Sequence, residues 1–321
     1  MDERERYIAK AARKRFNSTC GMLLVYLGIM TLVVFLNIFL QIGIGLLQFG
    51  VQGLGLVQAQ EKLLSQDFIN RISYSGIGYI FTTFLCLLLI RLWKGREFLR
   101  SVAKSQNRSM SVSSFLQIFC VFMGTQFLST LFSTGLEFLL NQFDLSATRA
   151  LEAASGGSTT ISMFLYVSIF APVTEELLFR GAVLHSLKPY GKRFAILFSA
   201  LLFGVFHGNI IQIPFAFLVG LVLGYVALEY SIWWSILLHF INNCIFGELL
   251  SFLPRLSQLF VFLLFIAGVV ILVKHARGIR TYRRQHQIYA PAAGWLFSTP
   301  CAIILLIYCV ASAVVGIQPN F

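Results

Sequence analysis

The sequence is poor in charged residues, and above all in acidic ones. Charged residues make up 12% of the 321 positions, with 13 Asp and Glu against 25 Lys and Arg, while hydrophobic residues make up 57%. A water-soluble fold covers its surface with polar side chains, and so few charges cannot do this unless lipid replaces water over most of the surface. The composition therefore predicts a membrane protein with several spans and excludes the disordered and fibrous classes.

Clustered cysteines are also missing. The six cysteines are scattered, almost all within apolar runs, and no C-x-x-C pair occurs. This pattern gives neither a disulfide framework nor a cysteine-rich metal site, so we expect the cysteines to pack as small apolar residues. The sequence also has no basic module interleaved with aromatic residues, and the net charge of +12 therefore does not indicate nucleic-acid binding.

Hydrophobic runs long enough to cross a bilayer recur along the chain. A helix needs about 20 apolar residues to cross the hydrocarbon core, and the runs predict an all-α, polytopic transmembrane bundle of about eight or nine spans. The glycines between 43 and 55 are expected to fray the end of the first helix, and residues 291–294 to form a short hinge. The predicted helices cover approximately 20–47, 73–92, 111–140, 160–187, 194–208, 210–229, 231–250, 257–274 and 293–316.

The basic residues indicate how the chain crosses the membrane. Cytoplasmic loops retain Lys and Arg, and an N-terminus in the cytoplasm places nearly all of the basic residues on that side. Only Lys62, Arg71, Arg149 and Arg255 then fall in outer segments, and Arg180 lies inside a hydrophobic run. We therefore expect a multi-pass cell-membrane protein with a cytoplasmic N-terminus. The Phe-rich composition and the lack of a retention signal favour a bacterial plasma membrane.

Polar clusters interrupt the hydrophobic runs, and the first lies in the run at 160–187. An ionisable side chain at membrane depth costs at least about 2.5–3.5 kcal/mol, so such groups are functional candidates by default. Glu176 and Arg180 are spaced i, i+4, so they share a helix face and can neutralise one another, whereas Glu175 is rotated by about 100°. We expect Glu176 to be an oriented support and Glu175 a candidate base. An ion pair that only locks two helices would leave Glu175 unexplained.

Two further clusters contain imidazoles and an amide. His207 ends a short predicted helix, and His239 and Asn243 are spaced i, i+4 on another. Each of these residues alone is typical of hydrogen-bonded packing. At about 1.5 Å per residue, however, Glu175, His207 and His239 lie roughly 14 to 21 Å from the cytoplasmic ends of their helices. Their common depth predicts one shared polar chamber inside the membrane, which opens towards the cytoplasm or laterally to lipid.

The residue types in this chamber suit peptide hydrolysis. A carboxylate in a low dielectric is a suitable base for water, and His207 can assist it. His239 and Asn243 can stabilise the oxyanion that forms when water attacks an amide. The alternative is a zinc site in which His207, His239 and Glu175 are ligands and one position stays open for water. The residues favour the carboxylate-activated water slightly, and the zinc alternative stays open.

The three motifs resemble those of the CAAX protease and bacteriocin-processing family of intramembrane endopeptidases, also called the Abi family. They are E-E-x-x-x-R from Glu175 to Arg180, F-x-x-x-H from Phe203 to His207 and H-x-x-x-N from His239 to Asn243, and the resemblance covers approximately residues 160–255. It implies a helical bundle with a conical catalytic chamber. Glu175 is then the catalytic carboxylate, Glu176 and Arg180 support it, His207 is its partner on water, and His239 with Asn243 forms the oxyanion side.

The resemblance also suggests a division of the chain and a class of substrate. We predict a basic cytoplasmic segment at 1–19, N-terminal transmembrane helices at 20–158, a catalytic core at 159–255 and C-terminal transmembrane helices at 256–321. The expected partners are the lipid bilayer and a peptide or protein substrate, either prenylated or bacteriocin-like. The family is described both as zinc-dependent and as metal-independent. The alternatives to an endopeptidase are a non-catalytic scaffold or self-immunity factor and a proton-coupled transporter.

Overall fold

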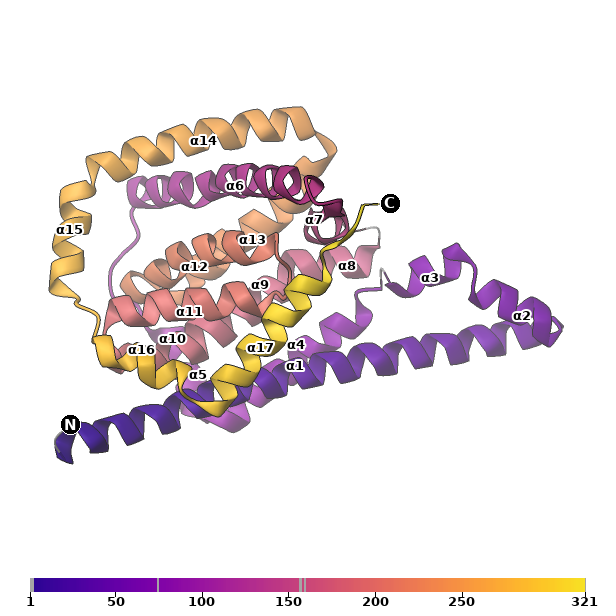
Figure 1. Cartoon of the computed structure of the whole chain (residues 1–321), viewed down its shortest axis with the longest axis horizontal. Helices are drawn as coiled ribbons and strands as arrows, with labels where there is room; N and C mark the ends of the chain where they lie inside the picture. Colours follow the sequence, from indigo (N-terminus) through magenta and orange to yellow (C-terminus); the bar gives the residue numbers. More distant parts are fainter. Residues whose placement is uncertain (1–2, 74, 156–157, 159, 321) are drawn as a thin grey trace.

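The chain forms a bundle of helices, as predicted, with one two-stranded pairing (Figure 1). The computed structural model describes residues 3–73, 75–155, 158 and 160–320. In the first half of the chain the elements are α1 (Glu3–Val51), α2 (Leu56–Leu63), α3 (Gln66–Ser73), α4 (Ile77–Lys94), α5 (Arg96–Lys104), α6 (Val112–Asn141), β1 (Leu145–Ser146) and α7 (Thr148–Ser155).

The second half begins with a helical stretch from residue 161 to residue 190 in which α-helical, π-helical and 3₁₀ turns alternate. Its parts are α8 (Ile161–Leu165), the π-helix η1 (Tyr166–Phe170), α9 (Ala171–Glu175), the π-helix η2 (Glu176–Val183), α10 (Leu184–Leu187) and the 3₁₀ turn η3 (Lys188–Tyr190). The elements that follow are α11 (Lys192–Phe206), α12 (Gln212–Glu229), α13 (Ile232–Phe240), the π-helix η4 (Ile241–Leu249), the 3₁₀ turn η5 (Leu250–Phe252), α14 (Pro254–Lys274), α15 (Ala276–Gln285), α16 (Ala290–Phe297), α17 (Pro300–Val315) and β2 (Gln318–Pro319).

Six helices of the described chain are long and apolar enough to cross a membrane, and a bent pair makes a seventh. The six are α1, α4, α6, the stretch 161–190, α12 and α14, and the bent pair is α16 with α17, which meet at 73°. This number is close to the predicted eight or nine. The predicted span at 194–208 corresponds to α11, which has 15 residues and is too short to be among the six.

One of two predicted interruptions agrees with the structure. α1 continues through Gly43, Gly45 and Gly50 and ends at Val51, within the stretch 43–55 whose glycines were expected to fray it. The space at Gly45 serves packing, because a Cβ there would lie 2.8 Å from the ring of Phe68 on α3. The hinge expected at 291–294 is misplaced, because those residues lie inside α16. The bend falls instead before Pro300, since a proline disfavours helical geometry in the residue that precedes it.

The centre of the bundle is the close pair of α11 and α12, while α6 and α14 pack together along one outer side and α1 runs along the other (Figure 1). Gly204 and Gly220 allow the two central helices to approach. A Cβ on Gly204 would lie 2.8 Å from the Ile213 carbonyl oxygen, and one on Gly220 would lie 3.1 Å from the Ala200 Cα. Phe179 and Phe203 are buried between these elements. This packing brings the end of α11 and the middle of α13 next to the helix at 161–190.

Candidate active site

A proline shapes the helix that carries the two glutamates. Pro172 stands in the first turn of α9, between the π-helical segments η1 and η2. Because proline has no N–H, it removes one bond of the helical ladder and disturbs the turn before it. Single π-helical turns are frequent at functional sites. Glu175 is the last residue of α9 and Glu176 the first of η2, so the two carboxylates leave the helix at a junction between two kinds of turn.

Glu176 lies at the centre of a buried network. Its side chain and that of Arg180 have no exposed surface, and Arg180 Nη1 lies 3.0 Å from Glu176 Oε1, as the i, i+4 spacing predicts. The same oxygen lies 2.9 Å from His239 Nδ1, and the Ser235 hydroxyl donates a hydrogen bond to the other oxygen, Oε2. The guanidinium carbon of Arg180 also stands 4.1 Å from the centre of the Phe203 ring. Both oxygens of Glu176 are therefore occupied by protein groups.

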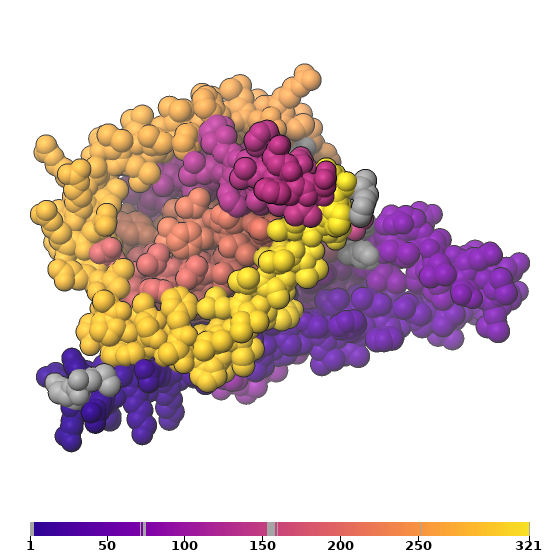
Figure 2. All heavy atoms as spheres, viewed as in Figure 1, coloured from indigo at the N-terminus to yellow at the C-terminus, as the bar shows by residue number. Residues whose placement is uncertain are grey.

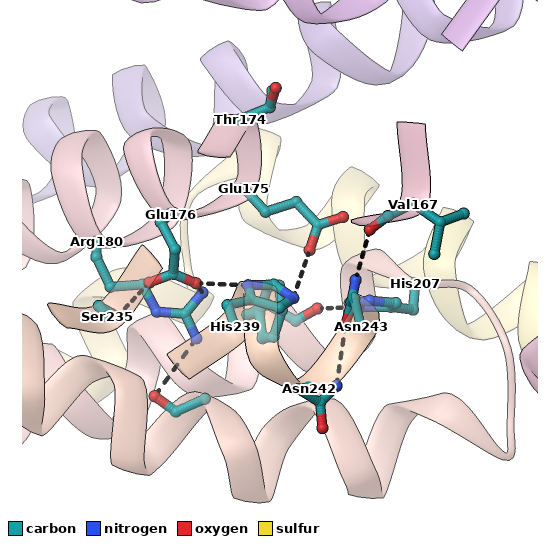
Figure 3. Close-up of polar contacts among 12 residues, drawn as sticks. Val167, Thr174, Glu175, Glu176, Arg180, His207, Ser235, His239, Asn242 and Asn243 are labelled. Atoms are coloured by element: carbon teal, nitrogen blue, oxygen red, sulfur yellow. Dashed lines mark hydrogen bonds and ion pairs between the residues drawn. The ribbon is translucent and has the colours of Figure 1, made fainter. Parts of the chain in front are cut away.

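His239 stands between the two glutamates (Figure 3). Its Nδ1–H donates to Glu176, because a carboxylate can only accept. Its Nε2 lies 3.8 Å from Glu175 Oε2, which is too long for a hydrogen bond but close enough for charge interaction. The Glu175 side chain is 25% exposed, whereas that of His239 is 7% exposed. Glu175 is therefore the carboxylate that a water molecule or substrate can reach.

The end of α11 brings the second imidazole to the same place. His207 Nδ1 lies 2.9 Å from the Phe203 carbonyl oxygen, so Nδ1–H donates and Nε2 is the nitrogen that can accept a proton. The Phe203 ring meets both imidazoles edge to face, with centroid distances of 4.9 Å to His207 and 5.9 Å to His239. One aromatic ring thus separates and orients the two histidines that the sequence placed on different spans.

Asn243 is oriented by a chain of amides. Its Nδ2 donates to the Val167 carbonyl oxygen at 3.0 Å, and its Oδ1 accepts from Asn242 Nδ2 at 2.9 Å. The Asn242 oxygen in turn accepts from Gln126 Nε2 at 2.7 Å. The oxygen and the nitrogen of the Asn243 amide are therefore both held in place, and one hydrogen on Nδ2 remains for another acceptor. The chain begins on α6 and ends in η1, so three helices hold this side chain.

Sequence reasoning missed three of these residues. Ser235 precedes His239 by four positions and so lies on the same face of α13, which is a pattern that could have pointed to it. Asn242 is the neighbour of Asn243 in the sequence, but its position alone did not indicate a role in the site. Gln126 lies 116 positions before Asn242 in the chain, and no sequence pattern links the two.

The arrangement does not fit the zinc alternative. Among the residues that the structure describes, no group of three or more His, Cys, Asp or Glu side chains could hold a metal ion. Glu175, His207 and His239, the ligands of that hypothesis, thus do not converge as a zinc site requires.

The geometry agrees with a comparison to known families. Residues 157–245 match the family model of type II CAAX prenyl endopeptidase Rce1-like proteins. This segment is similar to Rce1-like proteins. The match confirms the resemblance to CAAX proteases seen in the three motifs, and the segment contains all six predicted site residues. At the level of the family, it supports a membrane protease. No curated protein and no solved structure matches the chain.

Proposed function

We propose that the protein is an intramembrane endopeptidase in which Glu175 activates the water that hydrolyses a peptide bond. The difference between the two adjacent glutamates carries this proposal. Glu176 is fully buried and has partners on both oxygens, whereas Glu175 is partly exposed and lies 3.8 Å from an imidazole nitrogen. A general base must reach the proton it removes, and only Glu175 is placed to do so.

The proposed reaction uses each polar group of the site once. Glu175 takes a proton from a water molecule held between its carboxylate and His207 Nε2, and the water oxygen attacks the carbonyl carbon of the substrate. The oxyanion that forms accepts hydrogen bonds from His239 Nε2–H and from the remaining Nδ2 hydrogen of Asn243. The proton on Glu175 then passes to the departing amide nitrogen as the C–N bond breaks. Glu176 and Arg180 hold His239 and do not touch the substrate.

The scheme uses both ring nitrogens of His239 as donors. Its Nδ1–H already donates to Glu176, so Nε2 can donate to the oxyanion only when the ring carries both protons. In that form the ring would offer a positive donor to the developing oxyanion. Because Nδ1 of His207 faces a backbone carbonyl instead, His207 is suited to hold the water.

The substrate class that we propose is a membrane-associated peptide, prenylated in the manner that the family description names. The site lies among helices that are long and apolar enough to cross a membrane, which supports a site within lipid, and an N-terminus in the cytoplasm would put the basic end of the bundle on that side. A lipid-modified peptide would reach the site from the bilayer.

The test uses the full-length protein in lipid vesicles and peptides that end in Cys-aliphatic-aliphatic-X, with and without a prenyl group. Mass spectrometry of the products should show loss of the last three residues from the prenylated peptide. Glu175→Gln is the test variant and should lower the rate at least about 100-fold. Its matched control is Glu152→Gln, which removes an exposed carboxylate on α7 and should leave the rate unchanged. Folded wild-type protein that cleaves no such peptide would contradict the proposal and favour a non-catalytic scaffold. Equal cleavage by both variants would show that Glu175 is not the base.

A further inference from the structure

A second cavity lies away from the candidate active site, at the end of the bundle where α6 begins and α12 and α14 end. Its volume is about 870 Å³, and α6, α12, α14 and α15 form its walls. Figure 2 shows the hollowed surface between the outer rim of α14 and α15 and the central helices. Neither α14 nor α15 belongs to the Rce1-like segment, and the proposed hydrolysis uses no residue of this cavity.

The cavity is apolar at its inner wall and polar at its mouth. The inner wall consists of Ile118 of α6, Leu221 and Val222 of α12, and Ile271 and Leu272 of α14. These residues lie between less than one turn and about two turns inside the ends of their helices. The mouth contains Arg108, Tyr230, His275, Tyr282 and Gln285. The lining therefore changes from hydrocarbon-like to hydrogen-bonding over the length of the cavity, which matches a molecule with a polar head and an apolar tail.

The helix α15 turns its arginines away from the cavity. The cavity is lined here by His275, which precedes the helix, and by Gly278, Ile279, Thr281, Tyr282 and Gln285, whose spacings of three or four put them on one face. Arg277, Arg280 and Arg284 lie between these positions and are exposed. Arg108 is therefore the strong cation of the cavity itself, and the basic outer face of α15 is a separate feature.

Arg108 has hydrogen-bonding capacity to spare. The buried Glu229 is already bound by Lys192 Nζ at 2.7 Å and by the Tyr282 hydroxyl at 3.0 Å. Arg108 Nη2 stands further off, 3.6 Å from Glu229 Oε2, with 64% of its side chain exposed. Within the described parts of the chain its guanidinium donates no hydrogen bond. Two cations thus share one carboxylate, which leaves positive charge and unused donors at the mouth.

We propose that this cavity binds one anionic phospholipid, with its phosphodiester on Arg108 and an acyl chain along the inner wall. A guanidinium holds phosphate oxygens through two parallel hydrogen bonds, and the Tyr282 and Tyr230 side chains stand beside it at the mouth. A free phosphate ion would gain nothing from the apolar wall, whereas a lipid chain would bury it. The helix ends place the mouth at the interface between lipid and water on the basic side of the protein. The proposal does not depend on the proposed peptidase activity.

The test uses the purified full-length protein in detergent and counts bound lipid by native mass spectrometry. Phosphatidylglycerol should bind with one molecule per chain and about tenfold more tightly than phosphatidylcholine, because only the former keeps a net negative charge. Arg108→Gln removes the cation and Val222→Phe fills the wall, and each should weaken binding about tenfold. Arg277→Gln changes the charge equally on the other face of α15 and should leave the affinity within about twofold. A thermal unfolding curve for each variant verifies folding.

Three outcomes would overturn the lipid assignment. If Arg277→Gln weakens binding as much as Arg108→Gln does, the lipid only adheres to the basic surface. If Val222→Phe has no effect, no chain enters the cavity. If millimolar inorganic phosphate displaces the lipid, the mouth is a phosphate site. Selective phosphatidylglycerol binding that both cavity variants weaken, and that phosphate leaves unchanged, supports the proposal.

Discussion

His239 Nδ1 lies 2.9 Å from Glu176 Oε1, and the same oxygen lies 3.0 Å from Arg180 Nη1. One buried carboxylate therefore neutralises a buried guanidinium and orients an imidazole at the same time. The arrangement couples stability to chemistry, because the group that makes Arg180 tolerable inside the bundle also determines which nitrogen of His239 faces Glu175. Stability and activity should consequently respond to Glu176 in different ways.

The first prediction concerns that coupling. Glu176→Gln should destabilise the protein by about 3–5 kcal/mol, because it leaves Arg180 as an unpaired buried charge. Glu176→Leu combined with Arg180→Met removes both charges and should recover most of that stability. The double variant should nevertheless not cleave the peptide, since Glu176 no longer holds His239. Unfolding midpoints in detergent and peptide cleavage rates measure the two effects. Wild-type stability in Glu176→Gln, or wild-type cleavage in the double variant, would contradict this account.

Gln126 is predicted to position Asn243 through Asn242. Gln126→Leu removes the hydrogen bond to the Asn242 oxygen and should lower kcat about three- to tenfold with KM nearly unchanged, because the loss affects only the orientation of an oxyanion donor. Gln142→Leu, an exposed change just after the same helix, is the matched control. Steady-state kinetics separate the two constants. A rise in KM with constant kcat would show that Gln126 acts on substrate binding instead.

The close approach of α11 and α12 gives a third prediction. Gly204→Ala puts a Cβ 2.8 Å from the Ile213 carbonyl oxygen, so the helices must separate at a cost of about 1–3 kcal/mol. Because His207 lies three residues further on, cleavage should fall as well. Gly43→Ala, where nothing lies within 4 Å, should be neutral or slightly stabilising. Thermal unfolding compares the two, and equal midpoints would mean that the α11–α12 contact is not tight.

The helical architecture and the polar positions could be predicted because both leave a strong pattern in the sequence. Apolar runs of about 20 residues identify helices in lipid, and ionisable groups inside such runs are rare enough to stand out. The pair of Glu176 and Arg180 also followed from spacing alone. The rotation of Glu175 away from this pair was also predicted. In the structure the Glu175 side chain is 25% exposed, whereas those of Glu176 and Arg180 are fully buried.

The details of the site could not be read in this way, because π-helical turns change which residues face one another. The sequence assigned His207 as the imidazole nearest in role to Glu175 and placed His239 on the oxyanion side. It gave no sign that His239 would also lie beside Glu175, with Nε2 3.8 Å from Glu175 Oε2. Three π-helical segments, η1, η2 and η4, surround the site, and a helical period of 3.6 residues does not describe them. Contacts such as that of Gln126 with Asn242 depend on tertiary packing, which no local pattern encodes.

Chemical rescue of Glu175→Ala tests the central claim most directly. If Glu175 is the base that activates water, the Ala variant should lose at least about 100-fold in cleavage rate, and acetate should restore about tenfold or more by occupying the vacated space. Glu176→Ala should show no such rescue, because its site is closed to solvent. A Glu175→Ala variant that cleaves the peptide at close to the wild-type rate without acetate would contradict the account.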